Sequence, residues 1–230
     1  MSEIKRPPKE VVEELRKICT GSFSDTLDDL GIKGYMSHQI RPIYPPERRV
    51  VGPAITVRWT PAREPMKCGL DSIKAGLIAI DKTKSGDVYV AAIEGQTLED
   101  FRDIGLWGDL MALSASIRGM EGAVLDGATR DCDEIKRINF PTFARSISPT
   151  TTVRRVEAAG VNVPVICAGV LVNPGDIIVA DTDGVVVIPQ DIVREVLKKA
   201  KEFEEAEKKE REIIRSGKTW EELFKEGVRV

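Results

Sequence analysis

The pattern that most constrains this chain is a pair of apolar stretches on either side of a helix-forming one. GDVYVAAIEG (residues 86–95) and GAVLDG (122–127) are nearly continuous apolar runs bounded by glycine, which predicts strands buried on both faces. Between them, WGDLMALSASIRG (107–119) has the spacing of a helix. A strand, a helix and a second buried strand predict a βαβ unit with a parallel pair of strands. We therefore expect an α/β fold.

The helix of this unit has a predicted start, end and buried face. It is expected to begin near Gly108 and to stop at Gly119, because glycine is the usual residue just past a helix end. Leu110, Leu113 and Ile117 recur at helical spacing and are expected to face the core.

Further elements are predicted on both sides of the unit. An N-terminal helix is expected from residue 8 to residue 18. In GSFSDTLDDLG, Ser22 and Asp25 resemble a capping box and Gly31 a C-terminal stop. RRVVGPAITVRW is a strand interrupted by Gly52-Pro53, which is expected at a sheet edge or at a bulge. Three short β-rich runs follow later in the chain: VPVICAGVLV, GDIIVAD and GVVVIP.

No linker or low-complexity tract divides the chain. We expect one α/β domain over residues 1–190. A long charged helix is predicted from residue 191 to about residue 216. Residues 191–230 are thus expected to form a C-terminal helical extension that packs on the domain or on a neighbouring subunit.

Composition argues against several classes of function. The formal net charge of −3 does not fit a nucleic-acid-coating surface, and no apolar run is long enough to span a membrane. The stretch MSEIKRPPKEVVEELRK lacks the apolar region of a signal peptide, so a cytoplasmic location is expected. His38 is the only histidine, which removes histidine-based triads, and the four cysteines lack zinc-site spacing. Carboxylates, Arg, Lys or a hard metal ion must then carry any chemistry.

Topology is expected to bring four residues to one edge of the sheet. In a βαβ unit the helix starts near the carboxyl end of the first strand, and the second strand ends beside it. The helix start at Gly108 and Asp109 should therefore lie close to Arg130 and Asp131, which follow the second strand. Open α/β sheets bind their ligands at this edge.

The groups at this edge suit a 2-oxo acid. The backbone amides of Leu110 and Met111, with the helix dipole, form an anion site for a carboxylate. Arg130 is a bidentate donor for a carboxylate or an enolate oxygen, and Asp131 and Asp109 are hard ligands for Mg²⁺ or Mn²⁺. From spacing alone, the alternative is a helix cap at Asp109 and an ordinary surface ion pair between Arg130 and Asp131.

At these residues the chain resembles the RraA-like family, which includes the 4-hydroxy-4-methyl-2-oxoglutarate and 4-carboxy-4-hydroxy-2-oxoadipate aldolases. That family carries an Asp, then twenty residues, then Arg-Asp, and Asp109 with Arg130-Asp131 reproduces this spacing. The blocks VGPAITVR, GLWGDL, GMEGAVLDGATRD and VNPGDIIVADTDGVVVIP stand in the family's order. The resemblance spans residues 20–189, and the C-terminal extension resembles that of the aldolase branch.

The resemblance implies a three-layer β/β/α swivelling domain that assembles as a homotrimer or as a homohexamer, a dimer of trimers. It also implies a site near a subunit interface. A glutamate of a neighbouring subunit's C-terminal helix, with Glu207 and Glu210 as candidates, would then join that site.

The resemblance also implies a role for each residue of the motif. By position, the backbone of residues 108–111 would bind the substrate carboxylate, and Arg130 would contact the pyruvyl carboxylate or carbonyl oxygen. Asp131 would coordinate Mg²⁺ or Mn²⁺, and Asp109 would hold a water on that metal. The implied enzyme is a class II pyruvate aldolase, a lyase that cleaves a 4-hydroxy-2-oxo acid to pyruvate and a second carbonyl compound. Stabilisation of the enolate would also permit oxaloacetate decarboxylation.

A second function stays open at this point. The founding members of the family inhibit a ribonuclease by protein–protein contact and need no catalysis. The Arg130-Asp131 pair and the C-terminal extension favour an enzyme, because a metal-free regulator has no use for Asp131. A Schiff-base aldolase is disfavoured, since no lysine lies inside an apolar strand run.

Overall fold

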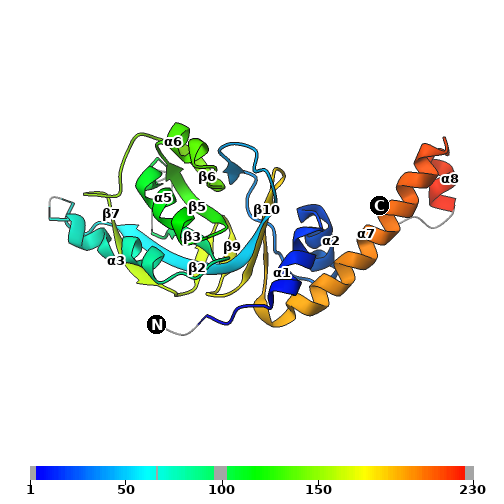
Figure 1. The fold of residues 1–230 in the computed structure, drawn as a ribbon, viewed down its shortest axis with the longest axis horizontal. Coiled ribbons are helices and arrows are strands. Elements are labelled where there is room, and N and C mark those ends of the chain that lie inside the picture. The colour runs from blue at the N-terminus through cyan, green and yellow to red at the C-terminus, as the bar shows by residue number, and fades with distance from the viewer. Residues whose placement is uncertain (1–3, 66, 96–102, 226–230) are drawn as a thin grey trace.

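A mixed β-sheet forms the centre of the molecule (Figure 1), as seen in a computed structural model that describes residues 4–65, 67–95 and 103–225. The main strand order is β1 (Arg41–Pro42), β6 (Thr142–Ile147), β5 (Gly122–Thr129), β3 (Val88–Ile93), β2 (Val50–Pro61), β10 (Ile177–Asp181) and β11 (Gly184–Ile188). Outside this order, β4 (Gly105–Trp107) pairs with β5, and β7 (Val156–Val161) pairs with β2.

The centre of the sheet is parallel and its far side is antiparallel. β2, β3, β5 and β6 are parallel neighbours, whereas β10 pairs antiparallel with both β2 and β11. All six residues of β3 are buried, and the strand pairs with β5 from Val88↔Gly122 to Ala92↔Asp126. The predicted parallel pair is thus confirmed.

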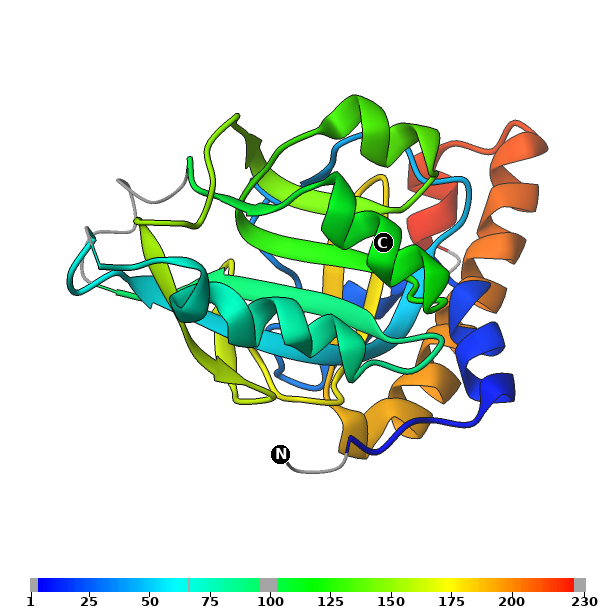
Figure 2. The ribbon, with the colours of Figure 1, turned by 60° about the vertical axis from the view of Figure 1, so that its left-hand side comes forward.

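The sheet is covered by helices on one face and by a hairpin on the other (Figure 2). The helices are α3 (Leu70–Asp81), α5 (Asp109–Ile117) and α6 (Cys132–Arg137), whose buried residues join one hydrophobic core with the sheet. The hairpin of β8 (Val165–Cys167) and β9 (Val170–Val172) encloses a second core. The expected three-layer β/β/α arrangement is therefore confirmed.

A third core lies beside β10 and β11 and is closed by helices from both ends of the chain. They are α1 (Lys9–Arg16), α2 (Thr20–Asp29) and α7 (Val193–Arg215), which follows a 3₁₀ turn at Gln190–Ile192. Beyond this core α7 extends away from the sheet. The short helix α8 (Trp220–Lys225), whose Leu223 is buried, folds back against α7 (Figure 1). The C-terminal helical extension is confirmed, while the domain boundary at residue 190 stays a prediction.

None of the helices that the structure describes combines the length and the apolar character that a membrane span requires.

The strand that contains Gly52-Pro53 is predicted to lie at a sheet edge or to contain a bulge. The edge is wrong, whereas the ladder of this strand with β7 does shift register, between Arg58 and Trp59. β2 is a central strand of twelve residues that changes partner at Gly52-Pro53. Up to Pro53 it pairs with β10, and from Ala54 it pairs with β3, so the missing N–H of proline falls where the ladder changes over. Gly52 is needed there because a Cβ atom would overlap the carbonyl oxygen of Gly86.

The start of α2 also differs from the prediction. The helix begins at Thr20, and the Cys19 sulfur accepts a hydrogen bond from the Ser22 amide (3.5 Å) as the N-cap. Ser22 is therefore inside the helix, where its hydroxyl donates to Glu204 on α7 (2.9 Å). The predicted stop at Gly31 is confirmed by its positive φ of 71°.

The predicted buried face of α5 is wrong as well. Leu110 and Ile117 are 74% and 75% exposed, whereas Ala112 and Ala115 are buried. Small side chains let the helix lie close to the sheet, and the longer side chains then point outward. The run VPVICAGVLV holds two strands rather than one, because Ala168 and Gly169 both adopt positive φ in a tight turn.

Candidate functional site

Along β5 the neighbouring strand changes from β3 to β4 near the carboxyl end. β3 pairs with β5 as far as Asp126, and β4 then continues the ladder at Gly105↔Ala128 and Trp107↔Thr129. Because α5 starts directly after β4, its N-terminus is held beside the end of β5. The Arg130 amide donates to the Trp107 carbonyl (3.0 Å), which confirms that helix start and strand end share one edge.

Asp131 has an unusual backbone conformation that directs its carboxylate. Its φ of 57° is left-handed, a region that Asp tolerates better than most residues. It precedes α6 as the N-cap but makes no side-chain capping bond to that helix. Instead, Oδ2 accepts hydrogen bonds from the Asp109 amide (3.4 Å) and from Arg130 Nε (3.1 Å). The carboxylate thus faces the N-terminus of α5.

Gly108, the N-cap of α5, leaves room for this pair. A Cβ atom at this position would stand 2.8 Å from Asp131 Oδ2 and 3.2 Å from Arg130 Nε. With a larger residue here, the ends of these two side chains would have to shift. An ordinary surface ion pair would account for the Arg130–Asp131 distance. It gives no reason for the glycine at position 108 or for the left-handed backbone of Asp131.

The two charged side chains are accessible. Arg130 is 42% exposed and Asp131 34% exposed, and an ion pair at such exposure contributes at most about 1 kcal/mol to stability. The guanidinium keeps donors, and the carboxylate keeps acceptor positions, that a ligand can use.

The first turn of α5 presents backbone donors next to the pair. The Ala112 amide makes the bond back to the Gly108 carbonyl (3.0 Å), so the amides of Leu110 and Met111 precede the first bond of the helix. With the helix dipole, such amides attract an anion. Asp109 lies at the same turn and is partly buried.

The donor set fits a hard divalent ion and not zinc. Among the described residues no group of three or more His, Cys, Asp or Glu side chains gathers as a ready metal site. Burial, together with the nearby carboxylates of Asp133 and Asp131, raises the pKa of the Cys132 thiol, so it stays protonated at neutral pH. Asp131 offers one carboxylate, and Mg²⁺ is commonly held by one or two carboxylates with substrate oxygens and water.

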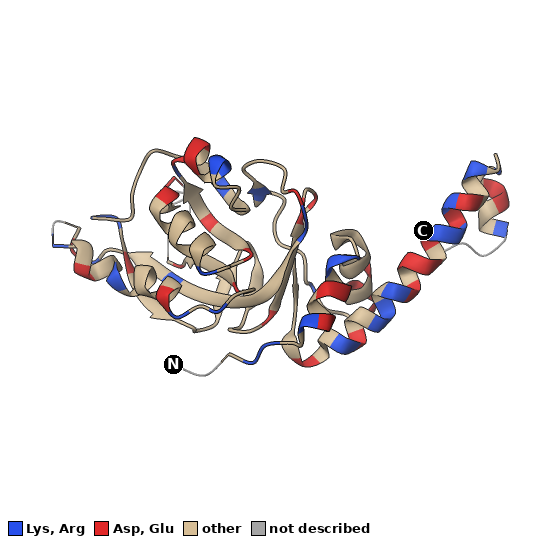
Figure 3. Cartoon of the chain, viewed as in Figure 1, with Lys and Arg blue, Asp and Glu red and all other residues tan. Residues whose placement is uncertain are grey.

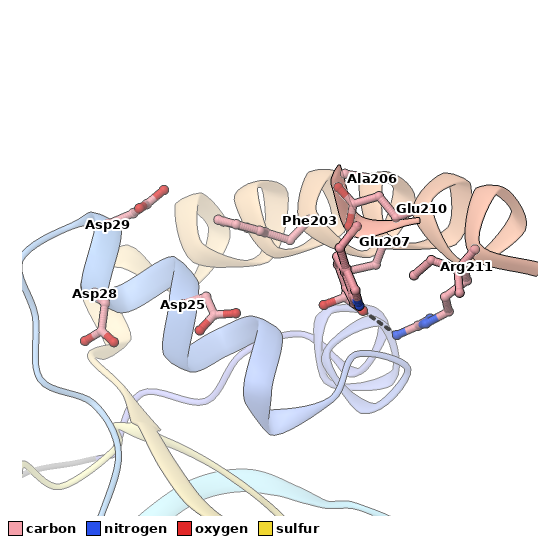
Figure 4. A pocket seen from close by; sticks show the side chains of 10 residues that line it. Asp25, Asp28, Asp29, Phe203, Ala206, Glu207, Glu210 and Arg211 are labelled. Atoms are coloured by element: carbon pink, nitrogen blue, oxygen red, sulfur yellow. Dashed lines mark hydrogen bonds and ion pairs between the residues drawn. The ribbon is translucent and has the colours of Figure 1, made fainter. Parts of the chain in front are cut away.

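Glu207 and Glu210 do not meet Arg130 within one chain. Both lie on α7, where they line a groove of about 460 Å³ against α2, and Glu207 pairs with Arg211 (Figure 4). This part of α7 projects away from α5 (Figure 1), and basic and acidic residues are interspersed along it (Figure 3).

Reasoning from the sequence missed the strand β4 and the loop that holds it. Gly105 packs against Thr150, which follows β6, and Arg130 lies on the same side of Gly105. β4 has only three residues, too few to form a periodic pattern. The GLW triplet directly before the helix start was the only signal available.

Comparison with known proteins gives consistent matches over most of the chain. A family model described as Aldolase/RraA (RraA-like) matches residues 20–187. A protein of Halalkalibacterium halodurans, named "Putative 4-hydroxy-4-methyl-2-oxoglutarate aldolase", is 35% identical over 190 residues, which cover 83% of this chain and 81% of that protein.

Two solved structures are similar over almost their whole length. An uncharacterized protein from Pseudomonas syringae pv. tomato has a TM-score of 0.81 and 33% identity over 96% of both chains. RraAS2 of Streptomyces coelicolor, described as an unusual member of the RNase ES inhibitor RraA protein family, has a TM-score of 0.78 and 27% identity. That match covers 91% of this chain and 99% of RraAS2.

Proposed function

Because the chain belongs to the RraA-like (Aldolase/RraA) family, we propose that it is a metal-dependent pyruvate aldolase. The substrate would be a 4-hydroxy-2-oxo acid, such as 4-hydroxy-4-methyl-2-oxoglutarate, and the products pyruvate and a second carbonyl compound. The observation that carries the proposal is the meeting of Arg130, the Asp131 carboxylate and the N-terminus of α5 at Gly108. The name of the Halalkalibacterium halodurans relative supports this substrate class.

Binding of the substrate would use backbone and guanidinium donors together. The amides of Leu110 and Met111 hold the carboxylate that neighbours the 2-oxo group, with the helix dipole behind them. Arg130 donates to the 2-oxo oxygen, where negative charge grows as the C3–C4 bond breaks. Its half-exposed guanidinium is available for this contact.

Asp131 is the residue that would hold Mg²⁺ or Mn²⁺. When bound, the metal supplies Lewis-acid stabilisation of negative charge on the substrate's oxygens. Asp131 Oδ2 is kept on the α5 side by the Asp109 amide and by Arg130, so its direction is set before any ligand arrives.

Asp109 would move the proton. Its carboxylate, directly or through a water, takes the proton of the C4 hydroxyl, and C4 becomes a carbonyl as the C3–C4 bond breaks. The bond's electrons pass to the pyruvyl fragment, where Arg130 stabilises the charge, and C3 then takes up a proton to give pyruvate. The same stabilisation would support loss of CO₂ from oxaloacetate as a side activity.

Assembly as a homotrimer or a dimer of trimers is part of the proposal. The outward-facing side chains of Leu110, Leu113 and Ile117 support it, since such an apolar helix face suits contact with a second copy. A partner's α7 would then bring Glu207 or Glu210 toward the site.

A coupled assay for pyruvate tests the proposal. Purified protein is given a panel of 4-hydroxy-2-oxo acids and oxaloacetate with Mg²⁺, with Mn²⁺ or with excess chelator. We expect pyruvate release that depends on the metal and is lost in Asp131→Asn and Arg130→Ala. Activity indifferent to the chelator and to both substitutions would contradict the proposal.

The second candidate is a regulator that inhibits a ribonuclease by binding it. The similarity to RraAS2, an unusual member of the RNase ES inhibitor RraA protein family, favours it. Inhibition of a ribonuclease by the Asp131→Asn variant, with no pyruvate release from the wild type, would support this candidate over the aldolase.

A further inference from the structure

We propose that Thr150 is a positioning residue, which holds the Arg130 side chain in place by fastening β4 to the loop after β6. The inference rests on the proposed function insofar as Arg130 is assigned a role in binding and charge stabilisation. The contacts of Thr150 themselves stand apart from that assignment.

The Thr150 hydroxyl uses its full hydrogen-bonding capacity. Oγ1 accepts from the Gly105 amide (2.9 Å) and from the Ser148 hydroxyl (3.3 Å), and it donates to the Asp103 carbonyl. A hydroxyl has one donor and two acceptor positions, and all three are occupied. One side chain therefore joins both ends of the segment that leads into β4.

β4 depends on such an anchor because its own ladder is short. It has three residues, and its strand pairing within the described chain is the two-pair register with β5, Gly105↔Ala128 and Trp107↔Thr129. The hydrogen bond from the Gly105 amide to the Thr150 hydroxyl thus holds the first residue of β4. Without this hydroxyl, the amide of Gly105 loses its partner at a buried position, and the exposed carbonyl of Asp103 loses its bond to Thr150.

The Arg130 side chain lies along the segment that Thr150 fastens. A Cβ atom on Gly105 would stand 3.8 Å from Arg130 Cδ, and one on Gly108 would stand 3.2 Å from Arg130 Nε. Between these two points, the Trp107 carbonyl accepts the Arg130 amide (3.0 Å). Glycine at both positions leaves room for the Arg130 side chain beside this segment.

The loop that carries Thr150 is tied to the same strand end. The Ser148 amide donates to the carbonyl of Thr129, the residue before Arg130 (3.0 Å). The contacts therefore connect Thr129 through Ser148 and Thr150 to Gly105, and β4 leads from Gly105 to Trp107, whose carbonyl accepts the Arg130 amide. A shift of β4 moves this carbonyl beside Arg130, and an error of about 1 Å in the position of a catalytic group costs about 10²-fold in rate.

Three variants separate positioning from ordinary stabilisation. Thr150→Val removes the hydroxyl and keeps the branched shape, while Thr150→Ser keeps the hydroxyl. Thr83→Val is the matched control, because the Thr83 hydroxyl also donates to a backbone carbonyl, that of Ile80 at the end of α3 (2.8 Å). Each is compared with the wild type by thermal unfolding, by steady-state cleavage with Mg²⁺, and by the ¹H–¹⁵N signal of Arg130 Nε. Arg130→Lys identifies that signal by its loss.

We expect Thr150→Val to shift or broaden the Arg130 Nε signal and to lower kcat by about tenfold, because the Arg130 guanidinium is displaced by a fraction of an ångström. Thr150→Ser should restore both within about twofold of the wild type. Thr83→Val should leave both unchanged, even where its Tm falls as far as that of Thr150→Val.

An unchanged Arg130 signal and a kcat equal to that of Thr83→Val would overturn the inference. A wild type that cleaves no substrate would instead contradict the proposed function. In that case the Arg130 signal of Thr150→Val still decides whether Thr150 positions this side chain.

Discussion

Two Arg–Asp pairs, one with its Asp within β5 and one directly after that strand, have opposite surroundings. Asp126, within the strand, pairs with Arg145 of β6, and both side chains are only 13% exposed. Asp126 also accepts the Ala168 amide of the β8–β9 hairpin (2.6 Å), and Arg145 bonds to Gln39. Every charged group of this pair thus has several partners inside the fold.

The pair at the end of the strand is arranged differently. Arg130 and Asp131 are neighbours in sequence, are 42% and 34% exposed, and share one bond of 3.1 Å. Apart from it, the Asp131 carboxylate accepts only the long bond from the Asp109 amide (3.4 Å) within the described structure. A buried, fully bonded pair holds the layers together, whereas an open pair keeps hydrogen-bonding capacity for a ligand.

The largest expected effect is loss of activity at the open pair. Asp131→Asn should lower kcat/KM for pyruvate release by about 10³-fold, because metal stabilisation of charge contributes several kcal/mol. Asn tolerates the left-handed conformation, so Tm should stay within about 2 °C of the wild type. Activity within tenfold of the wild type would remove Asp131 from the proposed site.

The buried pair should show the reverse behaviour. Asp126→Ala leaves the Arg145 guanidinium buried without its carboxylate, which should lower the free energy of unfolding by about 3 kcal/mol. Urea unfolding measures this loss, and kcat per folded molecule should remain within about twofold of the wild type. If Asp126→Ala kept its stability but lost activity, the Asp126–Arg145 pair would serve the reaction rather than the fold, and the proposed difference between the two pairs would be wrong.

Arg130→Lys should weaken catalysis without touching the buried pair. Lysine keeps the charge but lacks the planar fork, so kcat should fall about 10²-fold. Oxaloacetate decarboxylation should fall in parallel, because the same negative charge is stabilised in both reactions. Decarboxylation that stays intact while cleavage is lost would place Arg130 at another step.

The smallest expected effect concerns the exposed face of α5. In the separate subunit, Ile117→Lys should change the free energy of unfolding by less than about 0.5 kcal/mol, since the side chain is 75% exposed there, but it should lower the sedimentation coefficient of an assembled protein. Ala112→Leu on the buried face is the control, with an expected loss of about 1–3 kcal/mol. Equal destabilisation by both variants would show that Ile117 faces inward after all.

Local pattern and chain topology were sufficient to predict the α/β fold class and the meeting of the candidate residues at one edge of the sheet. The apolar runs that became β3 and β5 and the helix between them predict a parallel pair, and a parallel pair joined by a helix brings Arg130-Asp131 to the start of α5. These inferences rest on properties that are continuous along the chain. Gly119 and Gly31 were predicted as helix ends for the same reason, because a helix end depends on its own few residues.

Side-chain direction and partner choice were decided only by the tertiary structure. Whether Leu110 or Ala112 faces the sheet depends on how closely α5 approaches it, and whether Pro53 is tolerated depends on the strand beside it. The hydrogen bond from the Gly105 amide to the Thr150 hydroxyl joins residues 45 positions apart, and no local pattern predicts it. The sequence by itself determined the long helices, the buried parallel strands and their order along the chain, because backbone preference and periodicity are local. Only packing between distant segments decided that the Asp126–Arg145 pair is largely enclosed and that the Arg130–Asp131 pair after β5 stays exposed.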